Sequence, residues 1–368
     1  MRVGIGEKIR KLRRQTGKRQ EDLAEALGVT SQAVSRWETG GSYPDLELIP
    51  GIADFFGVAV GELFDREEKE IFTAAVDVGG TKIACGIADE GGNVLAEASF
   101  PTPTGEGSAE TAAKEMARTI RALSEKAGVP CKELRGIGVF SAGPVDPARG
   151  TVENPYTLPG WEGFPLTRRL SALTGLPVKL DNDANGALLG EVKLRELAGK
   201  RVLMVTLGTG VGAAFFDGEK LYRAGRFHPE LGHVIVSSEG EKCYCGRRGC
   251  LESRASGKAM NARAREAGYA DFPALKKSAE AGEGAARKLL GEILGDLRNG
   301  IWTLALLFKP EILILAGGIS AEFFPLLRDA VGDLSDGKED FVPPFRILPA
   351  FQNRNPALAG ASNLYGKG

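Results

Sequence analysis

One order of local structures occurs twice in this chain, and it constrains the fold more than any other feature. Residues 71–97, IFTAAVDVGGTKIACGIADEGGNVLAE, read as strand, glycine turn, strand, turn and strand. Residues 202–224, VLMVTLGTGVGAAFFDGEKLYRA, repeat that order. Helical stretches at 108–127, 184–197, 255–267 and 285–307 lie between and after the two copies. We therefore predict a duplicated α/β fold with a cleft between two lobes.

The bulk composition favours a protein of the cell interior. The 368 residues carry a net charge of −1, and 43% of them are hydrophobic. No apolar run approaches the roughly 20 residues that span a bilayer, and the N-terminus, MRVGIGEKIRKLRRQ, lacks the apolar core of a signal peptide. We expect a soluble cytoplasmic protein without a membrane partner. In that reducing compartment, a tight cysteine cluster is more often a metal site than a disulfide framework.

Residues 1–65 differ from the rest of the chain, because their sequence predicts a series of short helices. The stretch QEDLAEALG predicts a helix closed by Gly28, and TSQAVSRWETG predicts another that begins after the cap residue Thr30. Two helices joined by a tight glycine-containing turn form a helix-turn-helix. The alternative is a helical module that serves only oligomerisation. A charged linker, residues 66–70, follows and marks a domain boundary.

Glycine-rich turns predict a phosphate site. In DVGGTK, the residues Asp77, Gly79, Gly80, Thr81 and Lys82 follow a buried strand. Glycines let backbone N–H groups approach phosphate oxygens closely, and the acid could orient water on Mg²⁺. A second copy contributes Gly208, Thr209 and Gly210, and a third strand ends in Gly317 and Gly318, against which an adenosine could lie. A single such motif is usually only a hairpin turn, but two copies at matching positions favour ATP binding.

The sequence LDNDAN brings acidic side chains to a strand–helix junction. Asp183 is a candidate general base that accepts a proton from a sugar hydroxyl as the hydroxyl attacks the γ-phosphate. The alternative is a helix N-cap, a position that Asp fills well. The neighbouring phosphate loops favour the catalytic interpretation.

Three of the five cysteines and one of the two histidines lie in ELGHVIVSSEGEKCYCGRRGCLE. His233, Cys243, Cys245 and Cys250 form a Cys₃His set, which is typical of closed structural zinc sites. Free cysteines in a loop are the alternative. A metal there would also fix the flanking carboxylates Glu230 and Glu252, and His233 could bind zinc through one ring nitrogen and a ligand through the other. Paired carboxylates and an imidazole suit sugar hydroxyls.

In order, the chain contains DVGGTK, SAGPVD, NPYTLPGW, DNDAN, LGTGVG, HPELGH, CYCGRRGCLE and LAGG. Over residues 71–368 it resembles the ROK family of repressors and sugar kinases. The resemblance implies a two-lobed α/β actin-like (ribonuclease H-like) sugar-kinase fold with structural zinc and Mg²⁺ with ATP. It implies a small lobe at 71–183, a large lobe with the zinc site at 184–355, and a C-terminal helix at 356–368 that returns to the small lobe. Asp183 would be the catalytic base. The sugar-binding residues would be Gly143, Asn154, Asn182, Asp183, Glu230, His233 and Glu252.

The first segment resembles the Cro/repressor-like (XRE-type) DNA-binding family over residues 7–64. The resemblance places the third helix in the major groove of a double-stranded operator. Ser31, Gln32, Ala33 and Arg36 would face base edges, and Gln20 would hold a phosphate. Because one such module buries little surface, we expect a homodimer or a higher even oligomer.

The combined resemblance indicates an ATP-dependent, glucokinase-like hexose kinase fused to a DNA-binding domain and acting as a sugar-responsive regulator. The alternative is a catalytically silent sugar-sensing repressor. ROK repressors usually carry a winged helix-turn-helix and tend to lose the DxGGTK motif, whereas this chain keeps the motif. Glucose is the leading substrate, with fructose, mannose and N-acetylhexosamines left open.

Overall fold

The computed structural model describes residues 5–64, 70–225, 228–332, 334, 339–352 and 354–365. The chain forms two compact units, Met1–Glu70 and Ile71–Gly368. Each unit has its own hydrophobic core. None of the helices in the described residues is long and apolar enough to cross a membrane.

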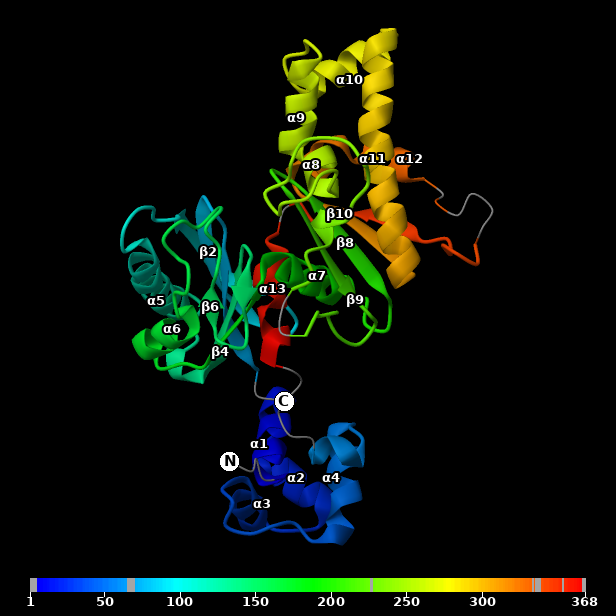
Figure 1. Cartoon of the computed structure of the whole chain (residues 1–368). Helices are drawn as coiled ribbons and strands as arrows, with labels where there is room; N and C mark the ends of the chain where they lie inside the picture. The colour runs from blue at the N-terminus through cyan, green and yellow to red at the C-terminus, as the bar shows by residue number, and fades with distance from the viewer. Residues whose placement is uncertain are drawn as a thin grey trace. The chain divides into compact units, whose positions relative to one another are not determined.

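The first unit is helical, as the sequence predicts (Figure 1). Its elements are α1 (Ile5–Gln15), α2 (Gln20–Leu27), α3 (Ser31–Glu38) and α4 (Ile49–Phe56), with the short 3₁₀ helices η1 (Leu46–Leu48) and η2 (Val60–Leu63). Gly28 adopts the left-handed conformation that closes α2, and Thr30 Oγ1 accepts a hydrogen bond of 3.2 Å from Ala33 N at the start of α3. These two caps fix the helix-turn-helix, which is packed around Leu23, Val34 and Trp37.

Two mixed sheets organise the second unit and confirm the predicted duplication. The five-stranded sheet has the order β3-β2-β1-β4-β7, and the four-stranded sheet has the order β11-β10-β8-β9. In each sheet the first strand of an antiparallel hairpin, β1–β2 or β8–β9, pairs in parallel with a later strand, β4 or β10. The first sheet comprises β1 (Phe72–Val78), β2 (Lys82–Asp89), β3 (Val94–Pro101), β4 (Leu134–Ser141) and β7 (Val178–Asn182). The second comprises β8 (Val202–Leu207), β9 (Val211–Phe216), β10 (Ile312–Ala316) and β11 (Arg346–Pro349).

The second copy of the repeat differs from the prediction at its third strand. Instead of a strand equivalent to β3, residues 217–225 contribute an isolated bridge between Leu221 and Phe216. The turn Asp217–Lys220 is present, with Asp217 Oδ1 accepting from two backbone N–H groups. The segment beyond the turn does not form the ladder that its sequence pattern predicts.

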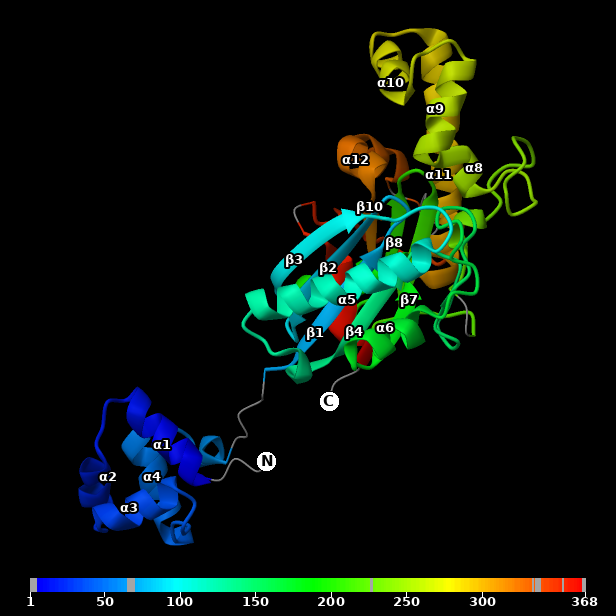
Figure 2. The same cartoon turned by 90° about the vertical axis from the view of Figure 1, so that its left-hand side faces the viewer.

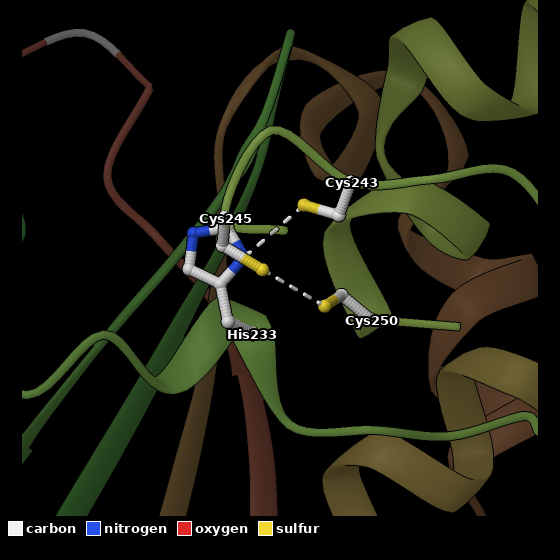
Figure 3. A group of neighbouring side chains, drawn as sticks. All are labelled: His233, Cys243, Cys245 and Cys250. Carbon is white, nitrogen blue, oxygen red and sulfur yellow. Dashed lines mark hydrogen bonds between the residues drawn. The ribbon is translucent and has the colours of Figure 1, made fainter. Parts of the chain in front are cut away.

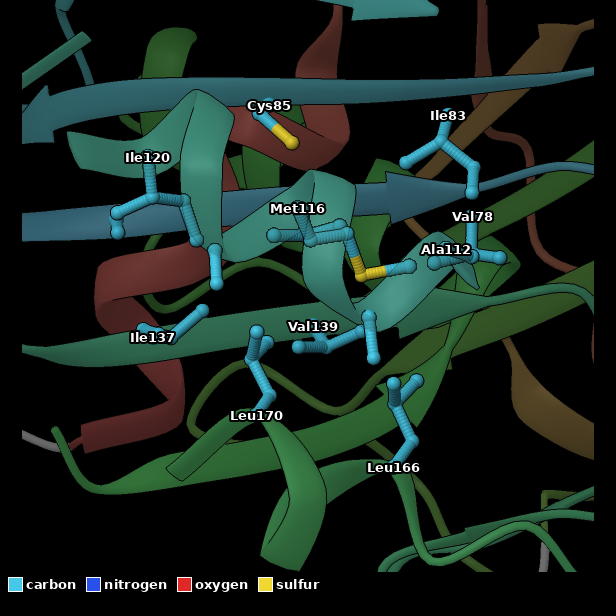
Figure 4. Packing of buried hydrophobic residues seen from close by; sticks show 14 of the residues in the cluster. Val78, Ile83, Cys85, Ala112, Met116, Ile120, Ile137, Val139, Leu166 and Leu170 are labelled. Carbon is cyan, nitrogen blue, oxygen red and sulfur yellow. The ribbon is translucent and has the colours of Figure 1, made fainter. Parts of the chain in front are cut away.

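Helices cover both outer faces. The first sheet carries α5 (Ser108–Lys126) and α6 (Leu166–Thr174), and Figure 2 looks onto that face. Met116 and Ile120 of α5 and Leu166 of α6 pack against Val78 and Val139 of the sheet (Figure 4). The second sheet carries α8 (Leu251–Ala255), α11 (Gly284–Phe308) and α12 (Gly318–Val331). Beyond α8 lie α9 (Gly257–Glu266) and α10 (Phe272–Glu280).

A shared core joins the two sheets. Between them lie α7 (Asp183–Leu194) and α13 (Pro356–Gly360), as Figure 1 shows. These helices approach so closely that a Cβ on Gly190 would lie 1.8 Å from Pro356 O, and only glycine fits at this position. After α13 the chain forms the 3₁₀ helix η5 (Ala361–Tyr365) where the sequence predicts a continuous helix, and residues 366–368 lie outside the described residues. The Tyr365 hydroxyl donates to Ile137 O at 2.9 Å and to Pro177 O at 2.8 Å, which ties this end to the first sheet.

We call the part built on the five-stranded sheet the first lobe and the part built on the four-stranded sheet the second lobe. The remaining short elements lie in the connections between these strands and helices. They are β5 (Val145–Asp146), β6 (Thr151–Val152), η3 (Cys131–Glu133) and η4 (Leu231–His233).

Candidate functional site

A cavity of about 420 Å³ lies between the two lobes. Its walls come from the ends of β1, β7 and β8 and from the loops that follow them. Strand ends that meet at one edge of a sheet are where α/β proteins usually bind ligands. The predicted site residues that line it are Asp77, Gly143, Asn182, Asp183, Gly208, Thr209, Gly210, Glu230 and Glu252. The predicted residues outside this lining are Gly79, Gly80, Thr81, Lys82, Asn154, His233, Gly317 and Gly318.

Each of the two glycine turns is closed by a backbone hydrogen bond. Gly79 N donates to Lys82 O at 3.0 Å, and Gly208 N donates to Gly210 O at 3.0 Å. Thr81 in the first turn and Lys82 at the start of β2 are exposed. The third glycine pair is different in kind: Gly317 has φ +89°, and a Cβ there would lie 2.4 Å from Leu207 O. Glycine at this position is therefore required by close packing of β10 against β8.

Asp183 is the first residue of α7, and it is not the N-cap. The cap is Asn182, whose Oδ1 accepts from Ala184 N at 2.9 Å, while Asp183 Oδ1 accepts from the same N–H at 2.8 Å. The pKa of Asp183 is raised to about 6, first because the cleft walls exclude water and then because Asp77 and Glu230 carry negative charge. A carboxylate with this pKa is suited to accept a proton near neutral pH.

Asp181 has a structural environment that the sequence does not reveal. It is fully buried and accepts hydrogen bonds from Arg223 Nη2 at 2.5 Å, Asn185 Nδ2 at 2.9 Å and Asn182 N at 2.8 Å. Three donors surround this carboxylate, so it holds the strand–helix junction in shape. The candidate base is consequently the second acid of the DNDAN motif.

Asn154 organises a loop of the first lobe. Its Nδ2 donates to Ala142 O at 3.2 Å and Thr157 Oγ1 at 2.7 Å, and its Oδ1 accepts from Tyr156 N at 2.9 Å and Thr157 N at 3.0 Å. The amide thus uses both donors and both acceptor positions internally. Its contribution to the cavity passes through Thr157, which lines the wall.

The cysteine and histidine side chains converge as predicted (Figure 3). The ligand atoms of His233, Cys243, Cys245 and Cys250 all lie within 4.8 Å of one another. His233 Nδ1 is 3.4 Å from Cys243 Sγ, and Cys245 Sγ is 3.5 Å from Cys250 Sγ. A tetrahedral zinc ion bonds sulfur at about 2.3 Å and nitrogen at about 2.0–2.1 Å. The four donors therefore fit a closed zinc site. Cys85, by contrast, is buried in β2, and Cys131 is half-buried in η3.

Backbone turns bring the four residues together. Cys243 N donates to Arg247 O at 2.7 Å, and Gly246 N donates to Cys243 O at 2.9 Å. Gly249 has φ +71°, and a Cβ there would lie 1.8 Å from Ser237 O, so the return of the chain requires glycine.

Two carboxylates extend from this cluster into the cavity. Glu252, at the start of α8, accepts a hydrogen bond of 3.0 Å from Val211 N. A Cβ on Gly210 would lie 2.5 Å from Glu252 Oε2, so this glycine leaves room for the carboxylate. The pKa of Glu230 is raised, because the cleft excludes water around it and Glu252 adds negative charge, while His233 opposes the shift.

His228 and Tyr244 are among the residues at the site that the sequence did not predict. His228 lines the cavity, and burial lowers its pKa to about 4. Tyr244 lies between two cluster cysteines, and its hydroxyl is 3.0 Å from His233 Nε2. The pKa of Tyr244 is raised by burial and then by the charges of Glu252 and Glu230, so both carboxylates are nearby. His233 therefore directs its second ring nitrogen at Tyr244, whereas the sequence prediction has this nitrogen contact the sugar.

The predicted DNA-reading residues lie on or beside α3 of the first unit. Gln32 and Arg36 are exposed and Ser31 is half-buried. Ala33, which we expect to face base edges, is half-buried and packs against the helical core. Gln20 Nε2 donates to Glu38 Oε2 at 2.8 Å, where Arg13 also binds, so in this structure its amide is engaged within the unit.

Comparison with known proteins agrees with this geometry. The ROK family model matches residues 73–367, and a Helix-turn-helix model matches residues 9–63. A glucokinase of Streptomyces coelicolor is 35% identical over 320 residues, which cover 79% of this chain and 96% of the relative. The structure of a ROK family glucokinase from Streptomyces griseus in complex with glucose and AMPPNP has a TM-score of 0.61 at 31% identity, covering 80% of this chain and 98% of that one.

A ROK family transcriptional regulator, a homologue of the E. coli MLC protein, is similar over more of the chain. Its structure covers 97% of this chain and 94% of its own, with a TM-score of 0.67. At 17% identity this similarity shows a shared fold.

Proposed function

The chain belongs to the ROK family, and we propose that it is an ATP-dependent hexose kinase joined to a DNA-binding helix-turn-helix through which it regulates transcription. The observation that carries the enzymatic half is the position of Asp183. Its carboxylate lines the interlobe cavity together with those of Asp77, Glu230 and Glu252. Its pKa of about 6 leaves it ionised at neutral pH.

The proposed reaction is a direct phosphoryl transfer. Asp183 accepts the proton of a hexose hydroxyl, for which we propose the 6-hydroxyl, as its oxygen bonds to the γ-phosphorus of ATP. The bond between that phosphorus and the β,γ-bridging oxygen breaks, and ADP leaves with the electron pair. Mg²⁺ bound with ATP would neutralise phosphate charge, with Asp77 orienting its water ligands.

Phosphate binding is assigned to the two glycine turns. Gly79 and Gly80 with Thr81 and Lys82 would act from the first lobe, and Gly208, Thr209 and Gly210 from the second. Gly318 is exposed at the start of α12, so adenosine could lie against it, whereas Gly317 is held by packing. Small residues at such turns let backbone donors approach phosphate oxygens.

Sugar binding is assigned to the opposite side of the cavity. Glu230, Glu252, Asn182 and Gly143 would contact sugar hydroxyls directly, because their side chains or backbone line the wall. Asn154 would act through Thr157, and His233 through Tyr244. We propose glucose as the first substrate to test because of the glucokinase similarity.

Zinc would be held by His233, Cys243, Cys245 and Cys250 and would have a structural role. The Cys₃His donors form a closed set, which leaves no position for substrate. The zinc would hold the loop between η4 and α8 in a fixed conformation. That loop carries Glu230 at one end and Glu252 at the other.

For the regulatory half, we propose a cytoplasmic homodimer or higher even oligomer on a pseudo-palindromic operator, with Gln32 and Arg36 reading bases. Sugar would change operator affinity if it binds the two DNA-binding states differently. The alternative, a catalytically silent sensor, draws on the similarity to the transcriptional regulator. The retained DVGGTK turn and the environment of Asp183 favour an active enzyme.

The test uses the full chain with ATP, Mg²⁺ and a panel of glucose, fructose, mannose and N-acetylhexosamines. ADP release and a phosphorylated sugar detected by mass spectrometry are the expected results. If a hexose binds in calorimetry and none is phosphorylated, the enzymatic proposal fails and the silent sensor is the better account. Operator titrations with and without the bound sugar test the regulatory half.

A further inference from the structure

Two exposed tyrosines from opposite lobes contact each other beside the cavity. Tyr156 lies between β6 and α6 of the first lobe, and Tyr244 lies between η4 and α8 of the second. Their ring centroids are 4.8 Å apart with an interplanar angle of 42°. The residues are 60% and 58% exposed, respectively. Because both side chains are largely exposed, neighbouring groups must hold them for the contact to persist.

The Cys₃His cluster holds Tyr244. Its ring packs edge-on against His233, with centroids 5.0 Å apart, and its hydroxyl is 3.0 Å from His233 Nε2. His233 Nδ1 faces Cys243 Sγ, so a metal in the cluster would take the lone pair of Nδ1 and leave the proton on Nε2. The Nε2–H then donates to the Tyr244 oxygen, and the phenol retains its own proton to donate. The carboxylates of Glu230 and Glu252 are the nearby acceptors.

A buried asparagine holds Tyr156. Asn154 is 1% exposed, and its Oδ1 accepts from Tyr156 N at 2.9 Å. The same amide bonds to Thr157, which lines the cavity. Tyr156 is therefore held by a buried asparagine and Tyr244 by a half-buried histidine, both next to sugar-side residues, although the two tyrosine rings are exposed.

We propose that Tyr156 and Tyr244 form an aromatic latch across the sugar side of the cleft, which holds the lobes at the separation where the sugar-binding groups face one another. The latch goes beyond the proposed function but rests on it where sugar is concerned. Both tyrosines are positioning residues. Tyr244 acts on His233 and the carboxylates, and Tyr156 acts on the distance between lobes.

The latch should affect sugar affinity more than the chemical step. A ligand's apparent affinity falls in proportion to the fraction of protein in the binding-competent state. Aromatic pairs contribute about 0.5–1.5 kcal/mol beyond their buried area, which corresponds to roughly 2- to 12-fold in affinity at about 1.4 kcal/mol per tenfold. Breaking the pair should raise the Kd and KM for hexose by that factor, while kcat changes little because Asp183 is untouched.

A double-mutant cycle tests the latch. The variants are Tyr156→Ala, Tyr244→Leu and their combination, with hexose Kd measured by calorimetry on the zinc-loaded full chain. Tyr156→Phe should bind hexose with wild-type affinity, because phenylalanine keeps the aromatic ring. Tyr43→Ala is the matched control, since Tyr43 is 75% exposed in the helix-turn-helix unit. Zinc content is measured for every variant, and only fully loaded protein enters the cycle.

The latch predicts that the double variant binds hexose no more weakly than the weaker-binding single variant, because either change already breaks the contact. If the Kd of the double variant rises by the product of the two single-variant increases, the latch is overturned. A second readout needs no sugar: Tyr156→Ala should speed amide exchange in residues 241–248 of the opposite lobe, and Tyr43→Ala should not. If the wild type binds no hexose, the proposed function fails, and this exchange measurement decides the latch by itself. Unchanged exchange in 241–248 would then reject it.

Discussion

Asp77 Oδ2 accepts a hydrogen bond of 2.9 Å from Asn355 Nδ2, although the two residues are 278 positions apart. Asp77 belongs to β1, and Asn355 is the N-cap of α13, where its Oδ1 accepts from Ala357 N at 3.0 Å. Burial raises the pKa of Asp77, and the hydrogen bond from Asn355 opposes that shift. Asn355 thus caps α13 and also stabilises the negative charge of Asp77, the carboxylate proposed to orient the water ligands of Mg²⁺.

Asn355→Asp should weaken binding of Mg²⁺ with ATP while leaving α13 capped. Aspartate caps helices as well as asparagine does, but it replaces a donor beside Asp77 with a second carboxylate. Because a hydrogen bond to a charged group is worth about 1.5–3 kcal/mol, the KM for ATP should rise roughly tenfold or more. Asn355→Ser is the control for the cap without the added charge. A wild-type KM for ATP in Asn355→Asp would contradict the role given to Asp77.

Cys245→Ser should lower both zinc content and sugar affinity. The wild type should contain one zinc per chain after purification without chelators, measured by elemental analysis. Loss of even an outer-shell partner typically costs 10- to 100-fold in metal affinity, so loss of a ligand should cost at least as much. Cys131→Ser, outside the cluster, is the control. Zinc-free wild-type protein with normal sugar affinity would show that the cluster does not shape the sugar site.

Arg13→Ala should destabilise the helix-turn-helix unit by about 3–5 kcal/mol, because it strands a buried charge. Arg13 binds Glu38 through Nε at 2.6 Å and Nη2 at 3.0 Å, and the Glu38 side chain is 2% exposed. Urea titration followed by amide exchange in residues 5–64 measures the effect. Arg14→Ala, on the exposed side of α1, should change stability little.

The same pair predicts a pH dependence. Burial alone would raise the pKa of Glu38, but hydrogen bonds from Arg13 and Gln20 outweigh it, and the pKa is lowered. A carboxylate with a lowered pKa in the folded state stabilises at neutral pH, and that stabilisation is lost as the pH falls through the folded pKa. The unit should therefore lose stability in acid in the wild type, and less so in Arg13→Ala.

Arg36→Ala should reduce operator preference while preserving non-specific DNA binding. An arginine that contacts a base edge contributes about 1–3 kcal/mol of discrimination. Anisotropy titrations should show weaker binding to a selected operator, with the salt dependence on random DNA unchanged. Arg328→Ala, in the other unit, is the control. Unchanged operator preference would remove Arg36 from the proposed reading surface.

Local patterns predicted the elements whose signals lie within a few residues. The apolar strand and glycine turn of DVGGTK gave the β1–β2 hairpin, and LGTGVG gave β8–β9, because strand period and turn chemistry are local. The Cys₃His cluster was predictable because its spacing and donor types are characteristic of zinc. The caps Gly28 and Thr30 follow from the same local rules.

The parts that the sequence did not predict depend on distant partners. Leu221 is in an apolar context but finds only one bridge partner, so its predicted strand does not form. Gln20 was expected at phosphate, but Glu38 engages its amide. The role of Tyr244 could not be predicted from the sequence around its neighbouring cysteines, because the ring that contacts it, that of Tyr156, belongs to the other lobe. The hydrogen bond between Asn355 and Asp77 could not be predicted, because it depends on the packing of α13 against β1.

The pH dependence of hexose phosphorylation by the wild type and by Asp183→Asn tests the central claim most directly. Because Asp183 must be ionised to accept a proton and its pKa is about 6, kcat/KM of the wild type should rise as pH increases through that value. Asp183→Asn should lose about 10²–10⁴-fold in kcat, bind hexose nearly as well in calorimetry, and lack the rising limb. The surface variant Asp329→Asn should behave as the wild type does. Turnover by Asp183→Asn at the wild-type rate, or a wild type that phosphorylates no hexose at any pH, would contradict the account.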